Sequence, residues 1–122
     1  MNNDVLVVDD EADMRVLVRG IIDRANEGLR VVSEAASGQE ALERWRETKP
    51  NVILLDHRMP DMTGLEAAEI VLAEQPDQHI VMFSAYLDDA TIERALELGI
   101  RACLHKKDLA RIPEMLWSLG AA

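Results

Sequence analysis

Several polar side chains in this sequence directly follow short apolar segments, and their types are suited to binding and transferring phosphate. Asp9 and Asp10 follow one such segment, Asp56 a second, Ser84 a third and Lys106 a fourth. If these segments are parallel strands of an open α/β sheet, their carboxyl ends share the edge at which such sheets bind ligands. If the first and third strands are neighbours, the three carboxylates meet beside the hydroxyl and the ammonium group.

Such a cluster of carboxylates favours a metal ion and a phosphorylated aspartate. Close carboxylates raise one another's pKa, and a divalent cation relieves their repulsion. Oxygen ligands suit Mg²⁺, whereas the lack of His or Cys at ligand spacing disfavours zinc. A carboxylate can attack phosphorus once cations neutralise the incoming charge, and Asp56 is the central candidate. Lys106 would then contact the phosphoryl oxygens and Ser84 would donate a hydrogen bond to one of them.

The segments that must position these residues alternate between two patterns. Short apolar runs rich in β-branched residues alternate with stretches of helical period, which is typical of βαβ units and a parallel sheet. The predicted strands are residues 5–8, 30–34, 52–55, 80–83 and 102–105. The first, third and fourth are continuous apolar runs, so we expect them to be central and buried on both faces.

Five helices are predicted between and after these strands. The first presents one apolar stripe and ends at Gly28; the stripe consists of Met14, Leu17, Val18, Ile21, Ile22 and Ala25. The second covers residues 38–48, the third follows Thr63 and Gly64, and the fourth follows Asp88 and Asp89, which are residues that cap helices. The last begins at about Ile112, because Pro113 fits only a first turn. Trp45 and Trp117 are interpreted as packing residues.

Composition limits the classes of function. A chain of 122 residues suits one domain, so residues 1–122 are interpreted as a single domain without an output domain. Its net charge of −10 repels nucleic acid and anionic lipid. The single cysteine, Cys103, excludes an intramolecular disulfide, and residues 1–10 lack the pattern of a signal peptide or membrane span. We therefore expect a cytoplasmic protein.

Four motifs in fixed order carry a family resemblance. They are VLVVDDE at residues 5–11, LLDHRMPDMTG at 54–64, FSA at 83–85, and Lys106. Together they resemble the response-regulator receiver domains of two-component signalling, including those of chemotaxis. The resemblance implies a flavodoxin-like, doubly wound fold with strand order 2-1-3-4-5 and helices on both faces. It also implies Mg²⁺ bound by Asp9, Asp10, Asp56 and the Arg58 carbonyl, phosphorylation of Asp56, and contacts from Ser84 and Lys106 to the phosphoryl group.

The resemblance further implies partners. A histidine kinase or a histidine phosphotransfer protein would donate the phosphoryl group near the first helix, and the protein would catalyse only its own phosphorylation and dephosphorylation. An output domain or effector protein would read the surface of the fourth helix, fifth strand and last helix, which is also the candidate interface of a homodimer. Cys103 replaces the Tyr or Phe that the family usually has three residues before the Lys.

Two other classes of protein compete with this interpretation. A pseudo-receiver would keep the fold and signal by docking alone, without Mg²⁺ or phosphorylation, but the complete set of acids argues against it. An enzyme on the same scaffold would be a phosphatase using Asp56 or a flavin protein. Flavin binding lacks support, because no Gly-rich or Ser/Thr-rich phosphate loop follows the first strand.

Overall fold

The five strands form one parallel sheet of order β2-β1-β3-β4-β5. The computed structural model describes residues 3–25 and 28–120. Its strands are β1 (Asn3–Val8), β2 (Leu29–Ala35), β3 (Val52–Leu55), β4 (His79–Ser84) and β5 (Ala102–His105). All five predicted strands are confirmed, with β1 starting two residues earlier and β2 and β4 extended by one residue at each end. The strand order implied by the family resemblance is also confirmed.

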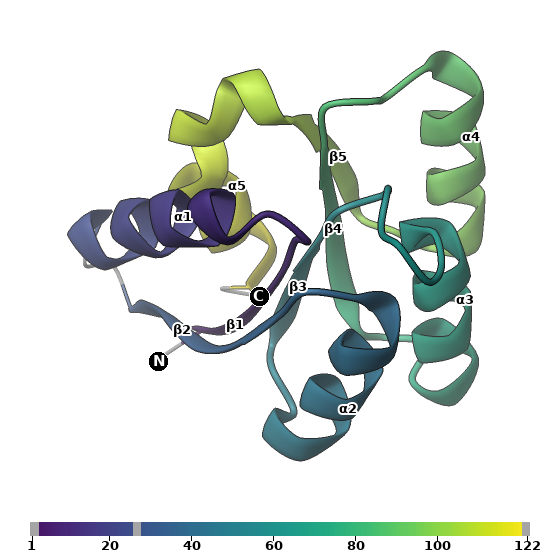
Figure 1. Cartoon of the computed structure of the whole chain (residues 1–122), viewed down its shortest axis with the longest axis horizontal. Coiled ribbons are helices and arrows are strands. Elements are labelled where there is room, and N and C mark those ends of the chain that lie inside the picture. The colour runs from purple at the N-terminus through teal and green to yellow at the C-terminus, as the bar shows by residue number, and fades with distance from the viewer. Residues whose placement is uncertain (1–2, 26–27, 121–122) are drawn as a thin grey trace.

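Helices cover both faces of this sheet, as expected for a doubly wound fold. They are α1 (Ala12–Ala25), α2 (Gly38–Thr48), α3 (Gly64–Glu74), α4 (Asp89–Leu98) and α5 (Ile112–Gly120). Figure 1 shows α1 and α5 on one face and α2, α3 and α4 on the other. A 3-10 helix, η1 (Lys106–Arg111), leads from β5 into α5, which begins at Ile112 as predicted. Pro113 therefore occupies the first turn of α5.

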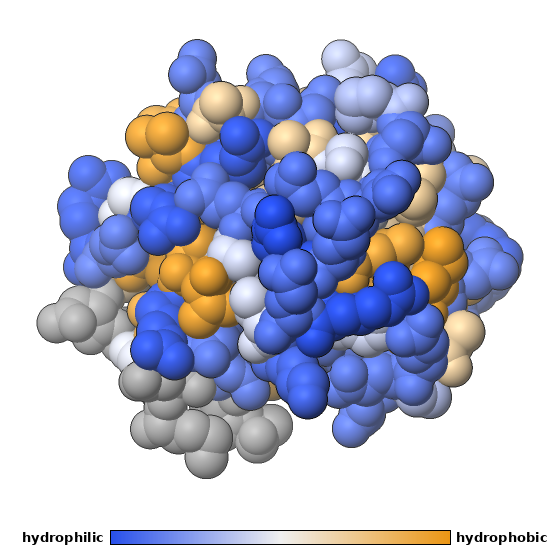
Figure 2. Space-filling model, turned by 60° about the horizontal axis from the view of Figure 1, so that its bottom comes forward, coloured by the Kyte–Doolittle hydropathy of each residue, from blue (hydrophilic) through white to orange (hydrophobic). Residues whose placement is uncertain are grey.

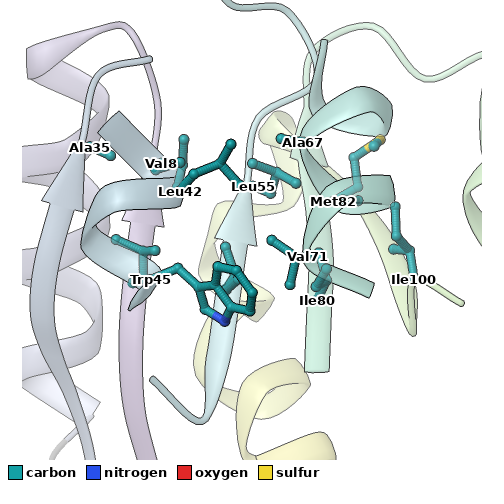
Figure 3. Close-up of a cluster of buried hydrophobic side chains, with 14 of the residues drawn as sticks. Val8, Ala35, Leu42, Trp45, Leu55, Ala67, Val71, Ile80, Met82 and Ile100 are labelled. Atoms are coloured by element: carbon teal, nitrogen blue, oxygen red, sulfur yellow. The ribbon is translucent and has the colours of Figure 1, made fainter. Parts of the chain in front are cut away.

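The central strands divide their side chains between two hydrophobic cores. Along β1, Val5 and Val7 pack under α1 and α5, whereas Leu6 and Val8 pack under α2 and α3. Successive strand residues point to opposite faces, so a sheet covered on both sides needs apolar residues at every position. Figure 3 shows the second of these cores, in which Trp45 lies buried as predicted.

Two predicted packing residues are more exposed than expected. On α1, Val18 and Ile22 are buried, but the neighbouring Leu17 is 50% exposed. On α5, Leu116 is buried and Trp117 is 41% exposed. Consecutive residues on a helix lie about 100° apart, so the residue next to a buried one falls on the flank of the helix. The prediction of a packed Leu17 and Trp117 is therefore wrong.

The helix ends follow ordinary capping chemistry. Thr63 and Glu66 form a reciprocal capping box at the start of α3, and the Asp88 side chain accepts a hydrogen bond from the Thr91 amide at the start of α4. Gly28 has a positive φ of 82°, but α1 is last described at Ala25 and residues 26–27 lie outside the described part.

Polar residues cover most of the face shown in Figure 2, where hydrophobic residues form small separate patches. Within residues 3–25 and 28–120, no helix is both long enough and apolar enough to cross a membrane.

Candidate functional site

The carboxyl ends of the central strands gather the predicted site residues at one edge of the sheet. Asp9 follows β1, Asp56 follows β3, Ser84 ends β4, and Lys106 follows β5. The backbone ladder continues for one residue beyond two of these strands. The Asp9 amide donates to the Ala35 carbonyl and the Asp56 amide to the Val8 carbonyl, each at 3.0 Å. The sheet itself therefore fixes the main chain of both acids.

Lys106 joins these acids through its side chain. Its Nζ lies 2.8 Å from Oδ2 of Asp9, 3.3 Å from Oδ2 of Asp56 and 3.5 Å from Oε1 of Glu11. Burial alone would lower the pKa of Lys106, but the Asp9 and Asp56 carboxylates outweigh it and raise the pKa above its ordinary value. The ammonium group thus stays charged between two buried carboxylates.

Asp56 is held in an environment that disfavours its ionised form. Its side chain is buried, and burial together with the charge of Asp9 raises its pKa to about 6. The ammonium of Lys106 and the hydrogen bond that the His57 amide donates to Asp56 Oδ1 at 2.8 Å oppose this rise. A further cation would stabilise the carboxylate.

Asp9 offers an oxygen suited to such a cation. Its Oδ1 accepts a hydrogen bond from the Glu11 amide at 2.9 Å. Its buried Oδ2 contacts Lys106 without hydrogen-bond geometry, and no other donor reaches it from the described residues. Carboxylate oxygens of Asp9, Asp10 and Glu11 lie within 4.8 Å of one another, with Asp10 and Glu11 exposed. This set of hard oxygen donors fits Mg²⁺.

The grouping of acids differs in one respect from the predicted ligand set. The three carboxylates that lie within 4.8 Å of one another, those of Asp9, Asp10 and Glu11, come from one turn. Asp56 is not among them, and Lys106 contacts both Asp9 and Asp56. Glu11, which the sequence places only within the first motif, also belongs to this cluster, and its Oε1 lies 3.5 Å from Lys106 Nζ.

The loop between β3 and α3 holds Asp56 by backbone packing. The Gly64 amide donates to the His57 carbonyl at 2.6 Å. A Cβ at Gly64 would lie 2.5 Å from the Asp56 carbonyl oxygen and 2.9 Å from the His57 Cα, and backbone atoms cannot move aside cheaply. The glycine that ends the motif therefore permits the close approach of α3 to the acid.

Asp61 in the same loop binds the start of α2 and makes no contact with the acids of the site. Its two carboxylate oxygens accept hydrogen bonds from the Gly38 and Gln39 amides, both at 2.8 Å. These amides at the start of α2 lower the pKa of Asp61. This motif residue thus connects the Asp56 loop to the first turn of α2.

A small cavity of about 290 Å³ lies next to the loop, and a second, of about 210 Å³, lies over Asp56 itself. The second is lined by Asp10, Glu11, Asp56, Arg58, Ala85, Tyr86 and Lys106. The Arg58 guanidinium stacks on the Tyr86 ring, 4.1 Å from its centroid, and closes one wall. The cavity is therefore lined by three carboxylates, one ammonium and one guanidinium.

Ser84 lies at the same edge but does not line this cavity. Its side chain is fully buried, and its Oγ accepts a hydrogen bond from the Tyr86 amide at 3.1 Å. The hydroxyl proton is not used in that bond, so it can be donated.

One residue near the site had no sequence signal. Arg15 on α1 donates from Nη1 to the Asp9 carbonyl oxygen at 2.6 Å. An arginine six residues after the acid is unremarkable in an amphipathic helix, so only the folded turn reveals the contact.

Sequence comparison places this arrangement among known proteins. The chain is 36% identical over 101 residues to the chemotaxis protein CheY of Thermotoga maritima, covering 83% of this chain and 82% of that protein. It is also 36% identical over 102 residues to the response regulator protein VraR of Staphylococcus saprophyticus. That match covers 84% of this chain but 48% of VraR, so the chain spans about half of that relative.

Solved structures share the fold over the whole chain. The response regulator domain of Thermotoga maritima CheB superposes with a TM-score of 0.91 at 28% identity, covering 100% of this chain and 98% of that one. The signal receiver domain of the putative response regulator NarL from Mycobacterium tuberculosis gives 0.91 at 29% identity, covering 99% and 98%. The family model described as the response regulator receiver domain matches residues 5–116. The chain therefore belongs to the response regulator receiver domain family of two-component signalling.

Proposed function

We propose that this chain is a single phosphoacceptor receiver domain in which Asp56 accepts a phosphoryl group with the help of Mg²⁺. The donor is the phosphohistidine of a histidine kinase or a histidine phosphotransfer protein. The observation that carries the proposal is the contact of one buried ammonium, Lys106, with both Asp9 and Asp56 below an open cavity. A nucleophilic carboxylate and a cation for the phosphoryl oxygens thus occupy one site.

The acidic turn supports the metal requirement. Asp9 and Asp10 would hold Mg²⁺, and the family resemblance adds Asp56 and the Arg58 carbonyl. The buried Oδ2 of Asp9, which is paired with Lys106 but has no hydrogen-bond donor of good geometry, and the adjacent carboxylates supply oxygen donors of the kind this ion prefers. When bound, the ion would neutralise charge on the phosphoryl oxygens during transfer.

The residues of the chain divide the reaction between them. A carboxylate oxygen of Asp56 forms a bond to phosphorus while the phosphorus–nitrogen bond of the donor breaks, and the imidazole keeps the electron pair. Lys106 then pairs with a phosphoryl oxygen in place of a carboxylate, and the Ser84 hydroxyl donates to another. In the later dephosphorylation step, water attacks phosphorus, which restores the Asp56 carboxylate and releases inorganic phosphate. The chain acts on its own aspartate and turns over no other phosphoester.

The output surface is α4, β5 and α5. Leu96 on α4 and Trp117 on α5 are 52% and 41% exposed, which supports contact with an effector, an output domain or a second copy. On β5, the half-buried Cys103 occupies the position of the family's aromatic switch residue. The change in this surface therefore proceeds without rotation of an aromatic ring at that position.

Phosphorylation with a small phosphodonor tests the proposal. Wild type, Asp56→Asn and Asp23→Asn are incubated with acetyl phosphate and Mg²⁺, and intact mass is measured. Asp23 is an exposed acid on α1 and serves as the matched control. We expect wild type and Asp23→Asn to gain one phosphoryl group, and Asp56→Asn or chelator-treated protein to gain none. Equal labelling of Asp56→Asn contradicts the proposal, unlabelled wild type supports a pseudo-receiver, and turnover of an external phosphoester supports an enzyme.

A further inference from the structure

An ion-paired chain of side chains runs from the edge of the sheet to the acidic turn. Arg15 uses two parts of its guanidinium, because Nη1 donates to the Asp9 carbonyl oxygen at 2.6 Å and Nε lies 3.3 Å from Glu34 Oε1. Glu34, on β2, also accepts from Nε and Nη2 of Arg19 at 2.9 and 2.7 Å. The order of contacts is Arg19, Glu34, Arg15, Asp9.

We propose that Arg15 is a positioning residue, which sets the orientation of Asp9 for Mg²⁺ and is itself aimed by Glu34. The inference rests on the proposed function, because it assumes that Asp9 binds the ion. Arg15 is constrained in a way that suits this role: its side chain is 20% exposed, and a planar guanidinium held at two points has little freedom. Groups that orient a metal ligand commonly change metal affinity 10- to 100-fold when removed.

The main chain is the route by which Arg15 acts. The main chain of Asp9 is held on both sides of its Cα, since its amide donates to the Ala35 carbonyl and its carbonyl accepts from Arg15. Its side-chain Oδ1 is fixed by the Glu11 amide two residues later. Without Arg15, the Asp9 carbonyl is free to rotate about the Cα–C bond, which displaces the Glu11 amide that holds Oδ1 and so changes the direction of Oδ2.

For Arg15, charge alone predicts the opposite change in Mg²⁺ affinity, which makes its role testable. A guanidinium beside a cation site repels Mg²⁺, so a purely electrostatic Arg15 would weaken binding and its removal would strengthen it. Neutralising Glu34 would then weaken binding, because a negative charge near the site is lost. In a positioning chain both changes weaken binding, and they act through the same contact.

The experiment is titration calorimetry of Mg²⁺ into the unphosphorylated protein. Arg15→Gln is expected to weaken binding by about 10-fold, and Arg15→Lys is expected not to restore it, because an ammonium cannot span Asp9 and Glu34 together. Glu34→Gln is expected to weaken binding by a smaller factor. The double variant is expected to bind no more weakly than Arg15→Gln, since residues in one network are not additive.

Controls separate this inference from the proposed function. Arg44→Gln removes an α2 surface arginine that pairs with Glu47, and its affinity should equal that of wild type. Asp9→Asn should lose binding. If Arg15→Gln unfolds in a thermal melt, Arg15→Lys carries the test, because it keeps the positive charge but cannot contact both Asp9 and Glu34. Unchanged or tighter binding in the Arg15→Gln, Arg15→Lys or Glu34→Gln variant overturns the inference alone, whereas wild type that binds no Mg²⁺ overturns the proposed function as well.

Discussion

Nζ of Lys106 lies 3.3 Å from Oδ2 of Asp56, so the cation that follows β5 already contacts the proposed acceptor before any phosphoryl group arrives. The same nitrogen is 2.8 Å from Asp9. Lys106 thus occupies the space between two acids that would otherwise repel each other, and it competes for the oxygens that a metal ion would use.

Lys106→Gln should therefore destabilise the metal-free protein and strengthen Mg²⁺ binding. Removing one partner of a buried ion pair leaves uncompensated charge, which lowers the free energy of unfolding by about 3 kcal/mol. Mg²⁺ should recover part of this loss, because it supplies the missing positive charge. Urea unfolding with and without Mg²⁺, and calorimetric titration, measure the two effects. Lys107→Gln is the matched control, because this neighbour is exposed; an equal loss in both variants would contradict the assignment.

Gly64→Ala should destabilise the fold and disturb the Asp56 loop. The new methyl group would lie 2.5 Å from the Asp56 carbonyl oxygen, and relieving that contact requires a backbone shift costing about 1–3 kcal/mol. Chemical denaturation measures the loss, and labelling by acetyl phosphate should fall with it.

Gly20→Ala provides the opposite control. This glycine lies within α1, and its added Cβ would meet only Arg24 Nη2 at 3.9 Å. Replacing a helical glycine by alanine should raise the free energy of unfolding by up to about 1 kcal/mol. Loss of stability in the Gly20 variant, or none in the Gly64 variant, would contradict the packing argument.

The elements of this fold could be predicted because its sequence patterns are local. Continuous apolar runs indicated the central strands β1, β3 and β4, and residues such as Thr63 and Asp88 marked helix starts through their own side-chain bonds. The strand order came only from the family resemblance, because no local pattern states which strands are neighbours.

The site could be predicted to the level of residue types but not of contacts. The first motif contains two adjacent aspartates that the sequence does not distinguish, yet Asp9 is buried and Asp10 is exposed. The role of Arg15 depends on Glu34 of a separate strand, and such pairing follows from side-chain positions in the folded turn. The burial of Leu17 was predicted wrongly, because an apolar stripe shows only which side chains a helix could bury. The elements that pack against the helix decide how many of those side chains are covered.

Asp61→Ala should destabilise α2, although Asp61 lies in the loop after β3. The carboxylate accepts two amides at the start of α2, and loss of such a cap costs about 0.5–2 kcal/mol. The pKa of Asp61 is lowered in the folded state, so its contribution is present at neutral pH and is lost as pH falls through that lowered pKa. Urea unfolding of variant and wild type at pH 7 and near pH 2 measures the difference, which should shrink in acid. A difference that stays constant would contradict the role of the charge.

Asp56→Asn should stabilise the metal-free protein at neutral pH. The folded-state pKa of Asp56 is about 6 against an ordinary value of 3.8, so the folded chain holds a proton that the unfolded chain has already released. The stability contributed by this group is therefore complete below pH 3.8 and is lost as pH rises through 6. The difference between these two pKa values corresponds to at most about 3 kcal/mol in the free energy of unfolding.

An uncharged amide does not ionise, so it does not lose this stability as pH rises. The difference in free energy of unfolding between Asp56→Asn and wild type should therefore grow from near zero at pH 4 to its maximum above pH 7. Urea unfolding in the presence of a chelator measures it, with Asp23→Asn as an exposed acid that should show no such growth. Mg²⁺ should then stabilise wild type more than Asp56→Asn, because a cation favours the ionised carboxylate and lowers its pKa. A variant less stable than wild type across this range would mean that the contacts of the Asp56 carboxylate with Lys106 and the His57 amide outweigh its burial.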